Sequence, residues 1–166
     1  MDQATNNRSI TPEERPVVEE LDRFATRPEV LAALRRAQAD AVKKLRRNPE
    51  IPATFVSMDP SDLGGTAPAA IGSIRVAVTR GAEGAGVERH ANSTQYLFAL
   101  DGPVETHVLT EDGWRADRYG QGDPALLEAR WHVVPPGVWH ESVAPGRREW
   151  SVVAFHSAKD ASDEYQ

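Results

Sequence analysis

Two side chains that can bind a metal ion or move a proton, Glu88 and His90, lie two residues apart in the sequence. Because alternate residues of a β-strand point to the same side, a strand through this segment places both groups on one face. His140 follows a Pro-Pro-Gly turn at residues 135–137, which can return the chain toward the same point. The chain has no cysteine, so only His, carboxylate or amide oxygen could hold a metal.

The segment around these residues resembles the first signature motif of the cupin superfamily, which reads H-x-H, three or four residues, E, six residues, G. Glu88 stands at the first His position and His90 at the second. Four residues then lead to Gln95 at the Glu position, and six more lead to Gly102. The spacing matches the family motif, while two of its ligand types are replaced.

The second cupin motif contains P-x-G-x-x-H, which Pro135, Gly137 and His140 match. The resemblance implies an all-β cupin-type β-barrel, also described as a double-stranded β-helix or jelly roll, over roughly residues 70–157. Cupins bind their metal through the four positions of these two motifs. The ligand set implied for this chain is therefore Glu88, His90, Gln95 and His140.

This set could hold a divalent metal ion. Two imidazoles and one carboxylate match the two-His-one-carboxylate pattern of non-haem Fe(II) sites, and Mn, Ni or Zn suit the same mixture of nitrogen and oxygen. Gln95 would add a neutral amide oxygen or orient a substrate. Glu88 would supply the anionic ligand that Gln95 does not, or act as a general base, and is the candidate catalytic residue.

The leading functional hypothesis is a metal-dependent enzyme that acts on a small organic molecule. Oxygenation is the first reaction class by analogy with the superfamily, and isomerase or lyase chemistry remains open. Because two ligand positions are altered, a metal-free ligand-binding or sensory barrel without catalysis is the alternative. A structural dimer with a vestigial pocket is a third reading, since function belongs to the site and not to the fold.

The sequence predicts many short strands separated by Gly, Pro and Asp-Gly turns, which is typical of a sandwich or barrel even without the resemblance. A loop at residues 59–66 separates the first two strands, and residues 158–166 are expected to form a loose polar tail. The expected strands are 53–58, 71–79, 95–100, 104–109, 114–119, 125–128, 131–134, 141–143 and 149–156.

Two amphipathic helices are expected before the barrel, which gives a division into an arm at residues 1–49, a barrel at 50–157 and the tail. Thr11 and Glu14 form a capping-box pattern, although Pro16 allows a later start. A second start at residues 26–29 leads to a helix that Asn48 and Pro49 end. The apolar stripes of these helices are expected to pack on the barrel or across a dimer.

The composition of the chain limits the kinds of partner that it is expected to bind. The 166-residue chain carries a net charge of −6, which disfavours nucleic acid and favours a small-molecule ligand or substrate. No apolar run is long enough to cross a membrane, and the first residues do not resemble a signal peptide, so a cytoplasmic protein is predicted. The helical stripes and the cupin resemblance together predict a homodimer.

The remaining histidines, His107, His132 and His156, fall in expected strands and are interpreted as structural groups. Arg75 and Arg89 are candidates to meet a substrate carboxylate, since guanidinium groups bind carboxylates through two parallel hydrogen bonds. Solvent exposure is the commoner fate of such side chains.

Overall fold

The computed structural model describes residues 10–64, 66–81, 84–144, 146 and 149–166. Two helices, α1 (Arg15–Ala25) and α2 (Pro28–Arg47), precede the strands of this described part. The strands are β1 (Ala53–Met58), β2 (Ser73–Thr79), β3 (Glu88–Arg89), β4 (Gln95–Asp101), β5 (Val104–Thr110), β6 (Gly113–Tyr119), β7 (Trp131–Val134), β8 (His140–Val143), β9 (Trp150–His156) and β10 (Glu164–Tyr165).

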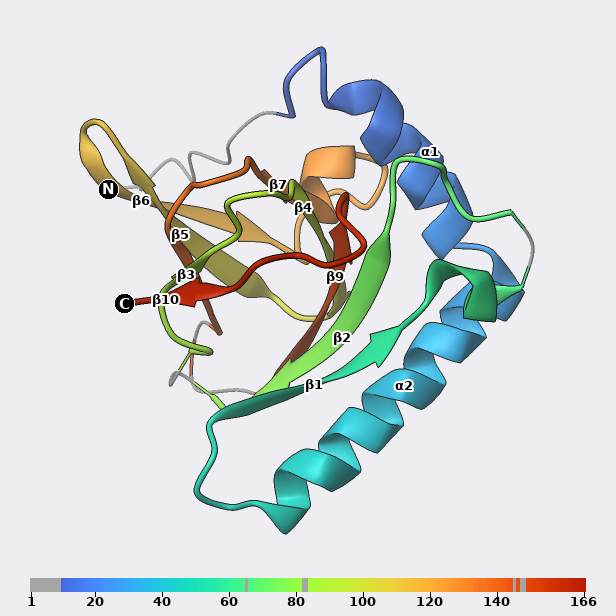
Figure 1. Ribbon diagram of the computed structural model, residues 1–166, viewed down its shortest axis with the longest axis horizontal. Coiled ribbons are helices and arrows are strands. Elements are labelled where there is room, and N and C mark those ends of the chain that lie inside the picture. Colours follow the sequence, from blue (N-terminus) through green and yellow to red (C-terminus); the bar gives the residue numbers. More distant parts are fainter. Residues whose placement is uncertain (1–9, 65, 82–83, 145, 147–148) are drawn as a thin grey trace.

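These strands form two antiparallel sheets of five strands each (Figure 1). One sheet has the order β1-β2-β9-β4-β7, and the other has the order β10-β3-β8-β5-β6. Strands distant in sequence therefore lie side by side, as β9 does between β2 and β4. The all-β prediction is confirmed, and the two facing sheets enclose the barrel interior.

Strand β9 shows how the two faces of the first sheet are used. All of its residues are buried, although their side chains alternate in direction. Val153 and Phe155 belong to a hydrophobic cluster shared with the helices, whereas Val152 and Ala154 belong to a second cluster inside the barrel. A strand with both faces covered reads as continuously apolar, which is the pattern seen here.

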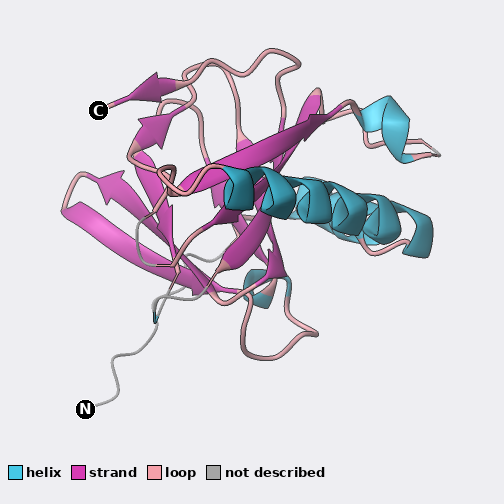
Figure 2. Cartoon of the chain, turned by 90° about the horizontal axis from the view of Figure 1, so that it is seen from below, coloured by secondary structure: helices cyan, strands magenta, loops and turns pink. Residues whose placement is uncertain are grey.

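The helices cover the outer face of the first sheet. Val30 and Leu34 of α2 are fully buried in the cluster that contains Ile74 and Phe155. Figure 1 shows α2 lying alongside β1 and β2, and in Figure 2 the helical layer lies in front of the strands. Of the two expected placements for the apolar stripes, packing on the chain's own barrel is the one observed.

The helix starts follow the sequence signals closely. The backbone N–H of Thr11 donates to the Glu14 carboxylate at 3.0 Å, and the N–H of Glu14 donates to the Thr11 hydroxyl at 3.2 Å. This reciprocal pair is the expected capping box, but it forms in the turn before the helix. The α-helix itself begins at Arg15, so the later start that Pro16 allowed is the one observed. Pro28 occupies the first turn of α2, where its missing N–H costs nothing.

Two expectations for the barrel were wrong. Residues 125–128 do not form a strand, because a short 3-10 helix at Leu127–Ala129 begins within that segment and occupies half of it. The C-terminal residues are not loose, because Glu164–Tyr165 forms β10 and pairs with β3. No helix among the described residues is long and apolar enough to cross a membrane.

Candidate metal centre

Three of the side chains expected at the site converge on one point between the sheets. The Glu88 Oε1 atom lies 3.6 Å from His90 Nε2 and 3.6 Å from His140 Nε2. The three potential ligand atoms all lie within 4.8 Å of one another. Both imidazoles are buried, at 2% exposure, while the Glu88 side chain is 22% exposed. The cluster is thus enclosed except on the carboxylate side.

Strand geometry explains this convergence. Glu88 and His90 alternate along β3 and its continuation, so both side chains leave the same face. Glu88 and His140 are directly opposite each other in the pairing of β3 with β8. Gly137, with φ of 76°, makes the turn before β8, and its N–H donates to the His90 carbonyl at 2.9 Å. The turn is therefore tied to the strand that carries the other two groups.

Hydrogen bonds orient both imidazoles in the same way. His140 Nδ1 lies 3.0 Å from the Val138 carbonyl, and His90 Nδ1 lies 3.1 Å from the Ser162 carbonyl. Since a carbonyl only accepts, the hydrogen-bond network assigns the proton to Nδ1 in both rings. The lone pair of each Nε2 is thereby directed toward Glu88, which is the orientation that a metal ligand needs.

Gln95, the fourth expected ligand, opens β4 on the opposite sheet and is 5% exposed. Its Nε2 lies 3.1 Å from His90 Nε2, so the amide donates to the imidazole lone pair. Its Oε1 is buried without a hydrogen-bond partner among the described residues. Rotation of the amide would exchange the two atoms and present an oxygen to the centre.

The electrostatics of the cluster favour a cation. Burial disfavours the ionised form of Glu88, but the hydrogen bonds and positive charge that His140 and His90 supply when they are protonated hold the pKa of this carboxyl well below its usual range. Burial also opposes the charged form of His90, yet Glu88, the Ser162 carbonyl and Asp163 together raise the pKa of His90. A centre that stabilises a proton in this way also attracts a metal cation.

Two further side chains lie next to the centre, although the sequence did not predict them there. His156 is paired with Gln95 across β9 and β4, and its ring meets that of His90 edge-on, with centroids 4.7 Å apart. Burial, followed by the charges of His90 and Arg75, lowers the pKa of His156 to about 3, so this imidazole is neutral at pH 7. Asp163 approaches His90 Nδ1 at 3.0 Å.

The other candidates lie elsewhere or are already paired. His107 contacts Glu105 at 2.6 Å, and His132 stacks on Tyr119 with centroids 5.5 Å apart. Arg75 forms an ion pair with Asp163 and Arg89 forms one with Glu164. The paired carboxylates therefore occupy the guanidinium groups that a substrate carboxylate was expected to meet.

A cavity of about 290 Å³ lies beside the centre, and Glu88 and Gln95 form part of its lining. The inner wall is apolar and comes from alternate residues of β4 and β9. Arg75 and Tyr165 also line the cavity. The apolar inner wall of the cavity consists of Leu97, Trp150, Val152 and Ala154.

The residues present fit a divalent metal ion. Two imidazole nitrogens and a carboxylate oxygen converge, and the His140 Nε2 atom is buried without a hydrogen-bond partner among the described residues. A buried polar atom left unpaired costs free energy, which a bound cation would recover. Nitrogen and oxygen donors of this kind suit Mn, Fe, Ni or Zn.

Comparisons with known proteins bear on the fold. No protein-family model matches the chain, and no curated protein matches it. Among solved structures it is similar to Peruvianin-I, described as a cysteine peptidase from Thevetia peruviana latex, with a TM-score of 0.54 and 13% identity over 70% of this chain and 68% of that one. This chain contains no cysteine, so a thiol nucleophile is not available to it.

Two enzymes named for oxalate are also among the similar solved structures. Oxalate decarboxylase from Bacillus subtilis matches with a TM-score of 0.53 and 12% identity over 69% of this chain and 28% of that one. A recombinant oxalate oxidase in complex with glycolate matches with a TM-score of 0.51 and 15% identity over 70% and 56%. The chain thus spans little more than a quarter of the decarboxylase and about half of the oxidase.

Together, the sheet order, the position of the cluster between the sheets and these similarities define the class of fold. The chain folds as a cupin-type barrel, as its two motifs predicted. At 12–15% identity the similarity extends to the fold and not to a particular activity. This barrel combines the fold with a Glu-His-His cluster in place of the usual ligand set.

Proposed function

We propose that this protein is a metal-dependent enzyme that acts on a small organic molecule. The observation that carries the proposal is the convergence of Glu88, His90 and His140 at the edge of a cavity. An ion in this position would be accessible from the cavity, as a catalytic metal must be. Mn, Fe, Ni and Zn are the candidate ions, and the Mn(II) centres named for the similar oxalate decarboxylase support including Mn.

The residues take distinct roles in this proposal. His90 and His140 are neutral ligands, oriented by hydrogen bonds to their Nδ1 atoms. Glu88 is the anionic ligand, since a pKa well below its usual range keeps its carboxyl ionised. Its position in the cavity lining makes it the candidate general base as well. Gln95 adds an amide oxygen or orients the substrate. A bound metal would supply a Lewis acid or a redox centre, with oxygenation the first reaction class and isomerisation or elimination the others.

The cavity favours a substrate with an apolar body and one polar end. Leu97 and Val152 form an aliphatic wall that suits hydrocarbon or ring surface. Trp150 adds ring surface to this wall, and its indole N–H, which is buried without a hydrogen-bond partner among the described residues, can donate to a polar group of the substrate. Arg75 already pairs with Asp163 at 2.9 Å and does not offer an unpaired charge. A small dianion such as oxalate would leave this wall unused, which argues against that substrate here.

The alternative is a metal-free barrel that binds or senses a ligand without catalysis. The altered ligand positions, Glu88 and Gln95, favour it. Metal analysis of protein purified without added metal separates the two functions. A stoichiometric transition metal supports the enzyme, whereas a metal-free protein that also fails to take up Mn, Fe, Ni or Zn on titration supports the binding barrel.

Glu88→Gln is expected to weaken metal binding more than Gln95→Ala does. A carboxylate attracts a divalent cation by charge as well as by its lone pairs, whereas an amide offers only a dipole. Gln95→Glu should leave affinity unchanged or tighten it, because a second carboxylate would then face the imidazoles. Competition with a chelator measures the metal affinity of all three variants. If Glu88→Gln binds like the unaltered protein, Glu88 is not a ligand and the metal-free barrel becomes the better proposal.

We also propose that the protein is a cytoplasmic homodimer. The apolar stripes of the two helices, which led to this prediction from the sequence, no longer support it. Their apolar faces are covered within the chain, so they leave no stripe for a second copy. The remaining support is that cupin barrels commonly form dimers through their sheets. Light scattering at micromolar concentration should give twice the 18.2 kDa chain mass, and a monomer mass would count against the dimer.

A further inference from the structure

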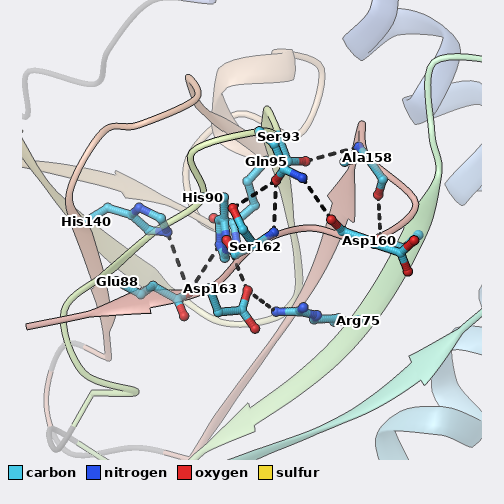
Figure 3. Close-up of polar contacts among 12 residues, drawn as sticks. Arg75, Glu88, His90, Ser93, Gln95, His140, Ala158, Asp160, Ser162 and Asp163 are labelled. Carbon is cyan, nitrogen blue, oxygen red and sulfur yellow. Dashed lines mark hydrogen bonds and ion pairs between the residues drawn. The ribbon is translucent and has the colours of Figure 1, made fainter.

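The C-terminal segment, residues 157–166, completes the wall of the candidate metal centre. It leaves β9 at His156 and returns to β3, where Glu164 pairs with Arg89 and Tyr165 pairs with Glu88. Strand β3 therefore lies between β10 and β8, so the segment covers an edge that would otherwise be open. In Figure 3 the Ser162 carbonyl and the Asp163 side chain lie next to His90.

Several contacts hold the segment in this position. Asn92 Oδ1 accepts from the Ser162 N–H at 2.9 Å, and its amide nitrogen donates to the Asp160 carbonyl at 2.9 Å. Arg89 donates twice to the Glu164 carboxylate, at 2.6 and 2.9 Å. A Cβ atom added at Gly72 would lie 2.3 Å from the Lys159 backbone nitrogen, so the segment also packs directly against the main chain before β2.

Asp163 is the member of this segment with the most specific placement. Its Oδ1 atom lies 3.0 Å from His90 Nδ1 and 2.9 Å from the Arg75 guanidinium. The ion pair with Arg75 fixes the carboxylate, whose side chain is only 24% exposed. The carboxylate thus faces the ring nitrogen opposite the one directed toward Glu88.

We propose that Asp163 is a positioning residue that holds His90 in the orientation and tautomer needed to bind a metal through Nε2. The inference rests on the proposed function. A carboxylate that accepts the second N–H of a ligating histidine fixes the ring and makes the other nitrogen a better donor. The Ser162 carbonyl accepts the His90 Nδ1–H at 3.1 Å, and the Asp163 carboxylate lies 3.0 Å from the same nitrogen, so Asp163 adds negative charge beside a hydrogen bond that the main chain makes.

Metal titration with Mn²⁺, Fe²⁺ and Zn²⁺ in competition with a chelator tests this role in the full-length chain. Asp163→Ala is expected to weaken binding by about 10-fold, at the lower end of the roughly 10–100-fold range for such partners, because the Ser162 carbonyl remains. Asp163→Asn should lose less, since its amide oxygen can still accept. Asp160→Ala is the matched control, because that exposed side chain lies on the same segment but makes no contact with His90.

Arg75→Gln separates positioning from a purely structural role. It breaks the same ion pair but leaves the Asp163 carboxylate free to accept from His90. Positioning predicts a smaller loss of affinity for Arg75→Gln than for Asp163→Ala. Equal losses in the two variants would mean that Asp163 only ties down the segment, and would overturn the proposal.

A second measurement does not depend on metal. In ¹⁵N NMR spectra of the imidazoles, Asp163→Ala should shift the His90 Nδ1 signal, while the His140 signal should stay in place because its Nδ1 bonds to Val138. An unmoved His90 signal would overturn the inference. If the unaltered protein takes up none of the ions but the His90 signal shifts, the contact stands and the proposed metal function fails.

Discussion

His90→Ala and His140→Ala are each expected to remove most of the metal-binding capacity of the protein. Each substitution deletes one of the two nitrogen donors that converge on Glu88, both of which are 2% exposed. The loss should exceed the roughly 10–100-fold that removal of an outer hydrogen-bond partner costs, because a direct ligand disappears. Metal content per chain after loading and gel filtration, measured by atomic emission, gives the result.

His107→Ala is the matched control for these variants. His107 is also a strand histidine with a carboxylate neighbour, Glu105, but its side chain is 33% exposed and lies away from the centre. The metal content of the His107→Ala variant should equal that of the unaltered protein. Unchanged stoichiometry in both the His90 and His140 variants would refute the assignment of the site.

Trp131→Ala is expected to destabilise the fold by about 3–5 kcal/mol, the usual cost of truncating a buried Trp. The Trp131 ring is 2% exposed and packs between Phe98, at 4.9 Å between centroids, and Phe155, at 5.6 Å. Its indole N–H also donates to Asp22 of α1 at 2.8 Å, so it joins the helices to the sheet. Asp22 keeps Arg130 as a partner in the variant, so the loss is mainly one of packing.

Trp114→Ala supplies the matched control, since the same atoms are removed from a side chain that is 50% exposed. It should change stability by no more than about 0.5 kcal/mol. Urea unfolding of both variants gives the comparison. A Trp131 variant as stable as the Trp114 variant would contradict the view that the helices are held by the outer face of the sheet.

The strands with strong apolar patterns could be predicted from sequence. Those at 53–58, 95–100 and 131–134 agree with β1, β4 and β7 to within a residue, because β-branched and aromatic residues there end at Gly, Pro or Asp-Gly turns. The strand predicted at residues 125–128 was wrong. Leu126 is 55% exposed and the 3-10 helix that follows is fixed by its contacts with neighbouring strands, which local pattern does not reveal.

The centre could be predicted in part. The i, i+2 relation of Glu88 to His90 is visible in the sequence, and motif spacing brought in Gln95 and His140. His156 and Asp163 could not be found in this way, since they approach the centre through strand register and the path of the C-terminal segment. A polar sequence with no periodicity, such as residues 158–166, gives no sign that Asn92 and Arg89 hold it in place.

Anomalous diffraction from crystals grown with Mn²⁺ tests the proposed metal centre directly. We expect one strong anomalous peak within coordination distance of Glu88 Oε1, His90 Nε2 and His140 Nε2, which already lie within 4.8 Å of one another. Rotation of Gln95 to present its oxygen to the ion would accompany it. No peak at this point, in protein that is otherwise folded as described, would contradict the claim that the cluster is a metal centre.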